Sequence, residues 1–174
     1  MSTPTDAHHR WLETLFERHG QALRAFATRR VGPDHADDIV SETFAVAWRR
    51  RDSVPDAALP WLYQVARNAI LHHRRPLARA LSVREAVAAT ADVTVAGPDA
   101  AASDLVERVL AQLADMDAEV LRLTVWEELA PGEIATVLGI SPGAARTRLM
   151  RARRRAQEVY LASEPETQPT PTIA

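Results

Sequence analysis

The sequence predicts an all-α protein made of two small helical domains joined by a flexible linker, the C-terminal one a helix-turn-helix. Apolar residues recur with helical spacing through most of the chain. Aromatic residues make up 5% of the composition and alanine is abundant, which favours thin helical cores over a large β-sandwich. Between the periodic regions, residues 77–102 form an alanine-rich stretch without clear periodicity, and this pattern predicts a linker.

Length and composition limit the classes of function. A chain of 174 residues with a net charge of -2 allows one ordinary domain or two small ones. Cysteine is absent, which excludes disulfides and thiolate metal sites. Lysine is also absent, so every basic side chain except histidine is arginine, a bias that a GC-rich genome also explains. With no signal-peptide pattern and no apolar run of about 20 residues, the sequence predicts a soluble, cytoplasmic protein.

Three helices are predicted in the first domain, residues 1–76. The first carries an apolar stripe and ends at Gly32, which follows two basic residues. The second, "PDHADDIVSETFAVAWRRR", is expected to be capped by Asp34. The third opens at Pro60, carries the stripe of "WLYQVARNAILHHRR", and is expected to end at Pro76.

The second domain is predicted over residues 103–160, with a disordered polar tail over 161–174. Asp104 is expected to open a helix through a capping box, and Asp117 to cap the next. The segment "PGEIATVLG" begins with proline and stops at glycine, and Ser141 is expected to cap the last helix. Two short helices joined by "LGIS" indicate a helix-turn-helix, whose second helix enters the major groove of DNA.

Six arginines and no acid lie between Ser141 and Arg155. At about 100° per residue, one sector of this helix is apolar and faces the core, while the opposite sector is small at first and then cationic. The core sector holds Ala145, Leu149, Ala152 and Ala156, and the opposite sector holds Gly143, Thr147, Met150 and Arg154. An ordinary solvated helix explains arginines in the last turns, where they complement the dipole, but not Arg146 and Arg148 near its start. We therefore expect DNA contact there.

The first domain separates its charges. Residues 31–48 hold four acids and no arginine, which favours a basic protein partner, although acids at a helix start also complement the dipole. Residues 67–84 hold five arginines, two histidines and no acid, which suits DNA, with Trp61 and Tyr63 as stacking groups. The stripe position of Trp61 favours a core role instead. His72 and His73 are adjacent in sequence and therefore poor metal ligands.

These segments carry a family resemblance. "DHADDIVSETFAVAW" resembles the polymerase-clamping helix of bacterial sigma factors, "PWLYQVARNAILHHRR" their promoter-melting segment, and "AEVLRLTVWEELAPGEIATVLGISPGAARTRLMRARRR" their C-terminal helix-turn-helix. With its short length and absent third region, the chain resembles the extracytoplasmic-function (ECF) group of the sigma-70 family over residues 12–75 and 105–157. It departs from the usual pattern at Ala114 or Asp115, Ala130, Ala145 and Arg146. A missing cap at Ala130 costs about 1 kcal/mol.

The resemblance implies an alternative sigma factor that binds core RNA polymerase through its clamp and flap regions, recognises -10 and -35 promoter elements and starts transcription. An anti-sigma factor is a further partner that the resemblance allows but does not establish. The implied polymerase-binding residues are Asp37, Asp38, Val40, Glu42, Thr43 and Trp48. The implied -10 residues are Arg51, Asp52, Trp61, Tyr63, Arg67, Asn68, His72, Arg74 and Arg75. The implied -35 residues are Ser141, Pro142, Gly143, Ala144, Arg146, Thr147, Arg148, Met150, Arg151 and Arg154.

Two other classes of function are compatible with a small helical chain. A stand-alone helix-turn-helix regulator that binds DNA as a dimer would have the same C-terminal motif, and it would shift duplex DNA without polymerase. A small helical enzyme lacks support, because the sequence contains no metal-ligand spacing, phosphate-binding glycine loop or nucleophile motif. We therefore predict no enzymatic activity, no catalytic residue, no metal and no cofactor.

Overall fold

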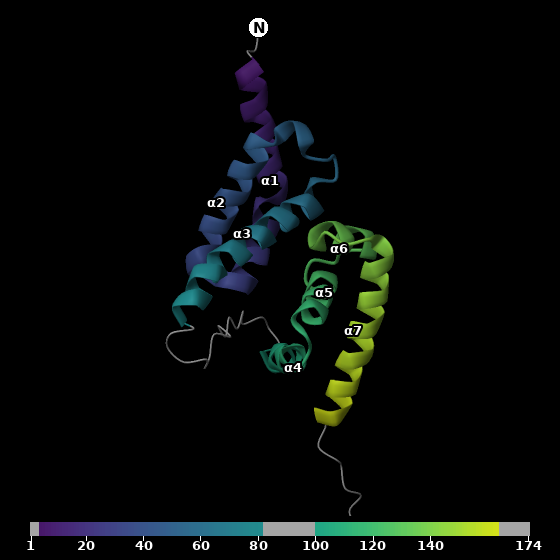
Figure 1. Ribbon diagram of the computed structural model, residues 1–174. Helices are drawn as coiled ribbons and strands as arrows, with labels where there is room; N and C mark the ends of the chain where they lie inside the picture. Colours follow the sequence, from purple (N-terminus) through teal and green to yellow (C-terminus); the bar gives the residue numbers. More distant parts are fainter. Residues whose placement is uncertain (1–3, 82–99, 164–174) are drawn as a thin grey trace, which may run out of the picture.

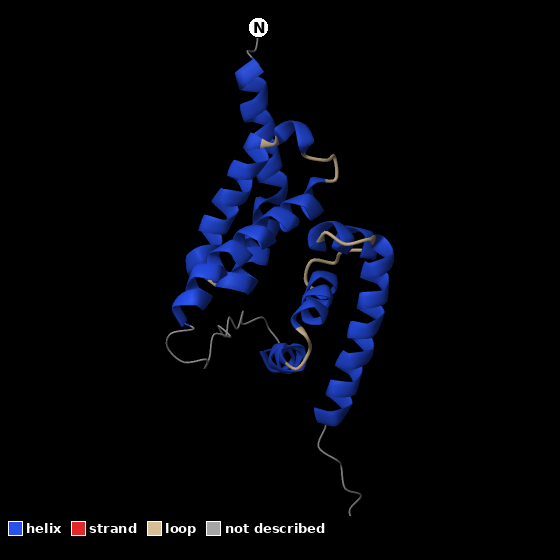
Figure 2. Ribbon diagram, in the orientation of Figure 1, coloured by secondary structure: helices blue, strands red, loops and turns tan. Residues whose placement is uncertain are grey.

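The structure, a computed structural model, describes residues 4–81 and 100–163, with side chains described over 6–72 and 105–162. These residues form seven α-helices and one short 3-10 helix, and no strand occurs among them (Figure 2). Within the same ranges, no helix has the length and apolar character needed to cross a membrane. The all-α prediction is confirmed.

The first half of the molecule is a bundle of α1 (Pro4–Val31), α2 (Pro33–Arg49) and α3 (Ala58–Leu81), with the 3-10 helix η1 (Arg51–Ser53) between the last two (Figure 1). Gly32 has a φ of 81°, a left-handed conformation that suits glycine, and its N–H donates to the carbonyl of Thr28 at 2.9 Å. The predicted end of the first helix at Gly32 is therefore confirmed. Leu23, Phe26 and Leu62 are fully buried where the three helices meet.

Three expectations for the first half were wrong. Helix α3 runs through Pro76 to Leu81, because a proline inside a helix removes one hydrogen bond without preventing the next turn. The same helix begins at Ala58, before Pro60. Gly32, not Asp34, is the N-cap of α2, and Asp34 lies in the first turn, where its charge meets the helix dipole.

The second half contains α4 (Ala100–Ala111), α5 (Asp115–Val125), α6 (Pro131–Leu138) and α7 (Pro142–Ser163). The expected starts after Asp104 and Asp117 were wrong. Helix α4 begins at Ala100, within an alanine run of high helix propensity, and the N-cap residue of α5 is Ala114, which provides no side-chain hydrogen bond. The turn between α6 and α7 follows the prediction. Gly139 has a φ of 65°, and the Ser141 hydroxyl accepts a hydrogen bond from the Ala144 N–H at 3.2 Å.

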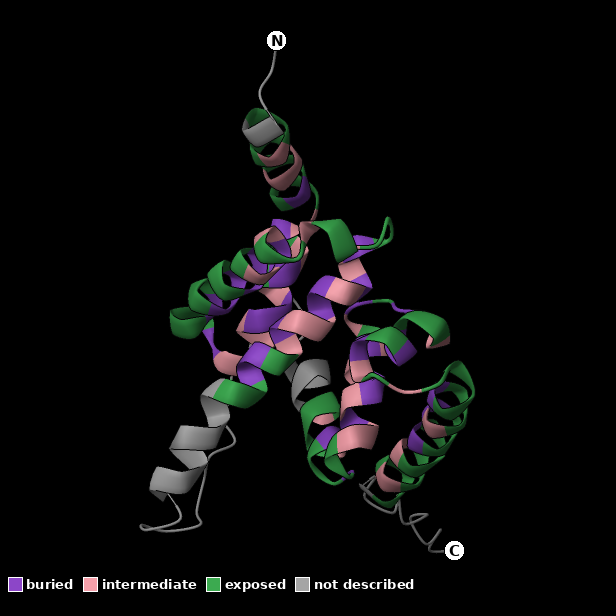
Figure 3. Ribbon diagram, turned by 45° about the horizontal axis from the view of Figure 1, so that its top comes forward, coloured by how far each residue is buried: buried purple, intermediate pink, exposed green. Residues whose placement is uncertain are grey.

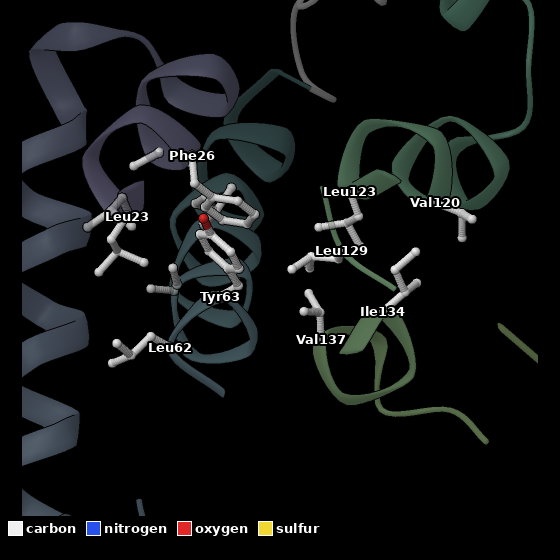
Figure 4. Close-up of a cluster of buried hydrophobic side chains, with 14 of the residues drawn as sticks. Leu23, Phe26, Leu62, Tyr63, Val120, Leu123, Leu129, Ile134 and Val137 are labelled. Carbon is white, nitrogen blue, oxygen red and sulfur yellow. The ribbon is translucent and has the colours of Figure 1, made fainter. Parts of the chain in front are cut away.

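The two halves pack against each other. Helix α3 contacts α6, and the buried apolar residues of both halves belong to one continuous cluster. Figure 4 shows Phe26 and Tyr63 of the first half on one side of this cluster, with Leu129 and Val137 of the second half facing them. Helix α7 lies on the far side of the second half from this contact, and exposed residues predominate on it (Figures 1 and 3).

The predicted linker core over 82–99 and the tail over 164–174 lie outside the described residues. The helices extend into the predicted linker from both sides, since α3 ends at Leu81 and α4 starts at Ala100. The domain boundaries at 76, 102 and 160 stay predictions.

Candidate functional site

Helix α7 buries one face and exposes the other. Ala145, Leu149 and Ala152 pack against α5 and α6, with exposed fractions of 0%, 6% and 0%. This is the core face that the helical arithmetic predicted, and Ala156 at its end is half-buried. Among the residues predicted to face DNA, those exposed are Ser141, Pro142, Gly143, Ala144, Arg146, Thr147, Met150, Arg151 and Arg154. The exposed face therefore begins with small side chains and continues with cations.

Arg148 differs from the other predicted DNA residues of α7. It is half-buried, and its guanidinium lies 3.6 Å from the carboxylate of Asp117 in the first turn of α5. Between α7 and this turn lies a cleft of about 600 Å³, and four of its nine lining residues are arginines. Its lining residues are Ala114, Asp117, Gly143, Ala144, Thr147, Arg148, Arg151, Arg154 and Arg155. Guanidinium groups in this arrangement can bind phosphate oxygens with paired hydrogen bonds.

A second groove on this half has a different character. It has a volume of about 340 Å³ and lies between α4, α5 and α7. Its lining is almost entirely apolar and comprises Leu105, Val106, Val109, Leu110, Leu121, Val125, Trp126, Ala156, Gln157 and Tyr160. Such a surface suits a protein partner better than DNA.

The acidic face of α2 is exposed. Asp37, Asp38 and Glu42 all reach solvent. Arg24 of α1 donates to both carboxylate oxygens of Asp37, at 2.7 and 3.4 Å, and this hydrogen bonding lowers the pKa of Asp37. Asp37 is therefore ionised at neutral pH and already has one basic neighbour. No sequence pattern predicts this pairing, because the two residues lie on different helices.

The other residues predicted to bind polymerase occupy different environments. Val40 and Thr43 lie in the core, with exposed fractions of 7% and 0%, and the Thr43 hydroxyl donates to the Ile39 carbonyl at 2.7 Å. Neither side chain can touch a partner in this conformation. Trp48 is half-buried, and its ring stacks on His9 of α1 with centroids 5.3 Å apart.

The residues predicted to bind the -10 element differ in their exposure to solvent. Asn68 and His72 are exposed, and Trp61 is half-buried. Arg67 is half-buried, and its guanidinium donates to the sulfur of Met116 in α5, at 3.6 Å. On η1, Asp52 is exposed, and the Arg51 guanidinium lies 5.8 Å from the Trp48 ring centroid. The side chains of Arg74 and Arg75 lie outside those described.

Tyr63 is inaccessible in this conformation. It is 3% exposed and stacks on Phe26 with ring centroids 4.7 Å apart. Burial, followed by the nearby carboxylate of Glu127, raises the pKa of Tyr63 to about 12. As a stacking group for DNA, it would have to lose its cover from the second half.

No group of three or more histidine, cysteine, aspartate or glutamate side chains that could hold a metal ion is found within the described parts of the chain. The candidate site comprises charged and apolar surfaces: acids on α2, mixed groups on η1 and α3, arginines on α7, and the apolar groove between α4, α5 and α7. Surfaces of opposite sign on one chain suit two different partners, one basic and one anionic.

Comparison with known proteins assigns both halves to one family. Residues 15–80 match Sigma-70 region 2, and residues 103–155 match Sigma-70, region 4. The ECF RNA polymerase sigma factor SigL of Mycobacterium tuberculosis is 33% identical over 146 residues, covering 79% of this chain and 82% of the relative. The sigma factor RpoE of Bartonella quintana, solved with the anti-sigma factor NepR, has a similar fold, with a TM-score of 0.65, 24% identity and coverage of 87% and 98%. CnrH, solved with the cytosolic domain of CnrY, has a TM-score of 0.60, 26% identity and coverage of 90% and 91%.

Proposed function

This chain belongs to the extracytoplasmic-function group of the sigma-70 family and is an alternative RNA polymerase sigma factor. We propose that separate surfaces of the chain bind core polymerase, the -10 element and the -35 element. The acidic face of α2 docks on the clamp of core RNA polymerase. Helix α3 and the loop before it bind the -10 element, and α7 reads the -35 element. The observation that carries this division is the separation of charge, with exposed acids on α2 and exposed arginines on α7.

The assignment of α2 rests on complementarity. Asp38 and Glu42 are exposed on one helix with no arginine between residues 31 and 48, so this face repels DNA and attracts a basic protein surface. The apolar groove between α4, α5 and α7 supports a second protein contact, and we assign it to the polymerase flap. In this proposal, Val40 and Thr43 do not contact polymerase; they pack in the core and hold α2, which carries the acidic face, in position.

The assignment of α7 rests on the order of its exposed residues. Gly143 and Ala144 come first, and small side chains let a helix backbone approach the major groove closely. Arg146 and Thr147 follow, in the part of the helix that contacts base edges when a recognition helix is docked in the groove. The later arginines lie in the part of the helix that leaves the groove, beside the phosphates.

In this scheme the chain neither makes nor breaks a covalent bond. Strand opening is driven by exchanging base stacking for protein contacts, an exchange of a few kcal/mol for each unstacked base. The protein acts in the cytoplasm beside its polymerase. Because RpoE was solved in complex with the anti-sigma factor NepR, we propose that an anti-sigma factor binds this chain and holds it inactive.

Run-off transcription tests the proposed function. Core polymerase is incubated with a genomic library, with and without this chain, and new transcripts that start at shared -10 and -35 sequences are expected in its presence only. A stand-alone regulator would instead shift duplex DNA as a dimer in the absence of polymerase. That outcome, together with no new transcript, would replace the proposal.

The polymerase surface has a sharper test. Asp38→Arg is expected to abolish co-purification with core polymerase, because it places a cation in the centre of the acidic face. Asp38 is exposed, so thermal unfolding should change little. Glu17→Arg makes the same charge change at an exposed position of α1 and serves as the control. Retained binding by Asp38→Arg would rule out the α2 assignment.

A further inference from the structure

An ion-pair network joins the two halves of the molecule. Arg29 and Arg30 end α1, while Glu119 lies in α5 and Glu127 in the loop after it. Arg29 donates to Glu127 at 2.6 Å, and Arg30 donates to Glu127 at 2.8 Å and to Glu119 at 3.1 and 3.3 Å. The side chain of Glu127 is 0% exposed and that of Arg30 is 9% exposed. The carboxylate of Glu127 is therefore enclosed by cations of the other half.

The same arginines border an aromatic stack. The Arg30 guanidinium lies 3.6 Å from the centroid of the Phe26 ring, and the same ring stacks on Tyr63 of α3. Next to Tyr63 along α3, the Gln64 amide lies 3.8 Å from the position that a Cβ on Gly139 would occupy, and Arg67 contacts Met116. The first half thus presents three guanidinium groups and an aromatic ring to the second half. The arginines contact Glu119, Glu127 and Met116, and Figure 4 shows Tyr63 facing Leu129.

The covered face has the chemistry of a nucleic-acid strand site. A guanidinium group can bind a phosphate through two parallel hydrogen bonds, and a nearby aromatic ring provides a surface on which a base can stack. The two carboxylates of the second half meet the donors of Arg29 and Arg30 at the distances that phosphate oxygens would take. Each carboxylate therefore occupies the place of an anionic ligand.

We propose that Arg29 and Arg30 bind the backbone of the melted promoter strand, and that Glu119 and Glu127 block this site while the two halves are closed. The inference rests on the proposed function, because it extends the -10 surface from α3 to the end of α1. It adds two residues that no pattern within α1 indicated, and it makes separation of the halves a condition for strand binding.

The energetics of this ion-pair network allow the two halves of the molecule to separate. Charges buried between two packed surfaces lose hydration, and this loss offsets most of their mutual attraction. When the halves separate, water or phosphate replaces the lost partners, so opening costs much less than the Coulomb energy of the pairs. The same four groups then favour a closed form without preventing its opening by a competing polyanion.

The test uses two variants that break the same network but differ in what they leave on the first half. Glu119→Gln/Glu127→Gln removes the blocking charges and keeps both arginines. Arg29→Ala/Arg30→Ala removes the arginines and keeps both glutamates. Binding of the full chain to a short fluorescein-labelled single-stranded DNA of mixed sequence is measured by anisotropy over a series of salt concentrations.

The proposal expects effects of opposite sign. If the open form is populated at about 10% or less, the glutamine variant should bind about tenfold tighter or more. The alanine variant should bind more weakly than the parent, with a logarithmic salt slope smaller by about 1.4, because two phosphate contacts are lost. Glu13→Gln/Glu107→Gln and Arg10→Ala/Arg18→Ala change the same net charge at exposed positions and serve as matched controls.

Two results would overturn part of the proposal. If both variants bind tighter, the arginines only hold the halves together and are not strand contacts. If the glutamine variant binds no tighter than its control, the carboxylates do not block a site. If circular dichroism shows that the alanine variant is unfolded, Arg29→Gln/Arg30→Gln replaces it. The assay contains no polymerase, so failure to bind core polymerase would defeat the proposed function and leave this result intact.

Discussion

Arg29 and Arg30 at the end of α1 are held by carboxylates of the other half, whereas Arg146, Arg151 and Arg154 on α7 face solvent. The Arg30 side chain is 9% exposed and meets Glu119 and Glu127 across the interface. The Arg154 side chain is 76% exposed and pairs within its own helix, with Glu158 at 3.5 Å. One arginine group is neutralised by the fold, and the other is available to an external anion.

The difference shows that packing decides what an arginine does. A guanidinium in low dielectric surroundings interacts strongly with its carboxylate, and removal of one partner leaves a buried charge uncompensated. A guanidinium in water interacts weakly with its neighbours and is screened by salt, so it can exchange them for phosphate without loss. Substitution of Arg29 and Arg30 should therefore change how the two halves are arranged, whereas substitution of the exposed arginines of α7 should change DNA binding.

The largest expected effect separates these two groups directly. Arg29→Ala/Arg30→Ala should open the molecule, because deletion of one side of a buried ion pair costs about 3–5 kcal/mol while the halves stay closed. Arg153→Ala/Arg154→Ala should leave the closed form unchanged. Because the native chain has no cysteine, dyes can be placed on Gln21→Cys and Gln112→Cys, and energy transfer measures their separation. Equal changes in both variants would mean that the two groups do not differ.

A second prediction concerns ionisation of Tyr63. Its pKa is about 12 because it is buried, whereas an exposed tyrosine ionises near 10. Since the closed form has the higher pKa, a rise in pH from 10 to 12 should favour the open form. Glu119→Gln/Glu127→Gln should lower the pKa of Tyr63 toward 10. A pKa that stays near 12 in this variant would mean that the second half does not cover the ring.

Phenolate absorbance provides the measurement. The chain has two tyrosines and no lysine or cysteine, so few other groups titrate in this range. Tyr160→Phe removes the second tyrosine, and the remaining signal then belongs to Tyr63. Glu13→Gln/Glu107→Gln, which changes charge away from the interface, should keep the pKa near its parent value.

Much of the fold was predictable because its signals are local. Helical spacing identified the face of α7 formed by Ala145, Leu149 and Ala152, and the glycine at 139 and the serine at 141 marked the turn before it. Helix starts and ends were less predictable. Pro76 did not end α3, and the alanines at the start of α4 extended that helix beyond its expected cap.

The environments of the site residues were less predictable, because their partners lie far away in the sequence. Glu127 meets Arg29 and Arg30, which precede it by 98 and 97 residues, and no spacing within one helix indicates such a pair. Tyr63 lies outside the apolar stripe predicted for α3, yet it is 3% exposed, stacks on Phe26 of α1 and faces Leu129 of the second half (Figure 4). The pattern within each helix predicted which face is apolar, and the packing of the halves decided which polar face is covered.

A third prediction tests whether the exposed arginines of α7 are alike. Arg146→Ala is expected to change which -35 sequences are used, with a penalty of about 1–3 kcal/mol on the preferred one, because early residues of a docked helix meet base edges. Arg154→Ala should weaken all sequences alike, since phosphates carry no sequence information. A randomised -35 library transcribed by each variant measures this. Uniform losses in both would make Arg146 another phosphate contact.

The smallest expected effect is a change in the free energy of unfolding on substitution of Glu128, the residue next to the buried Glu127. Glu128 is exposed and has a φ of 54°, close to the 65° of Gly139, although it carries a Cβ. A non-glycine residue in this region costs about 1–2 kcal/mol, and glycine costs about 0.5–1 kcal/mol in lost chain entropy. Glu128→Gly is therefore expected to raise the free energy of unfolding by about 0.5–1 kcal/mol, measured by urea denaturation.

Glu128→Ala distinguishes the backbone from the charge, because it removes the same carboxylate and keeps the Cβ. If backbone conformation is the cause, the alanine variant should gain no stability, and equal gains in both variants would assign the effect to the charge instead. Neither change touches the carboxylate of Glu127, so energy transfer between the halves should stay at its parent value in both. Two adjacent glutamates would then act in separate ways: Glu127 through the arginines of the other half, and Glu128 through the conformation of its own loop.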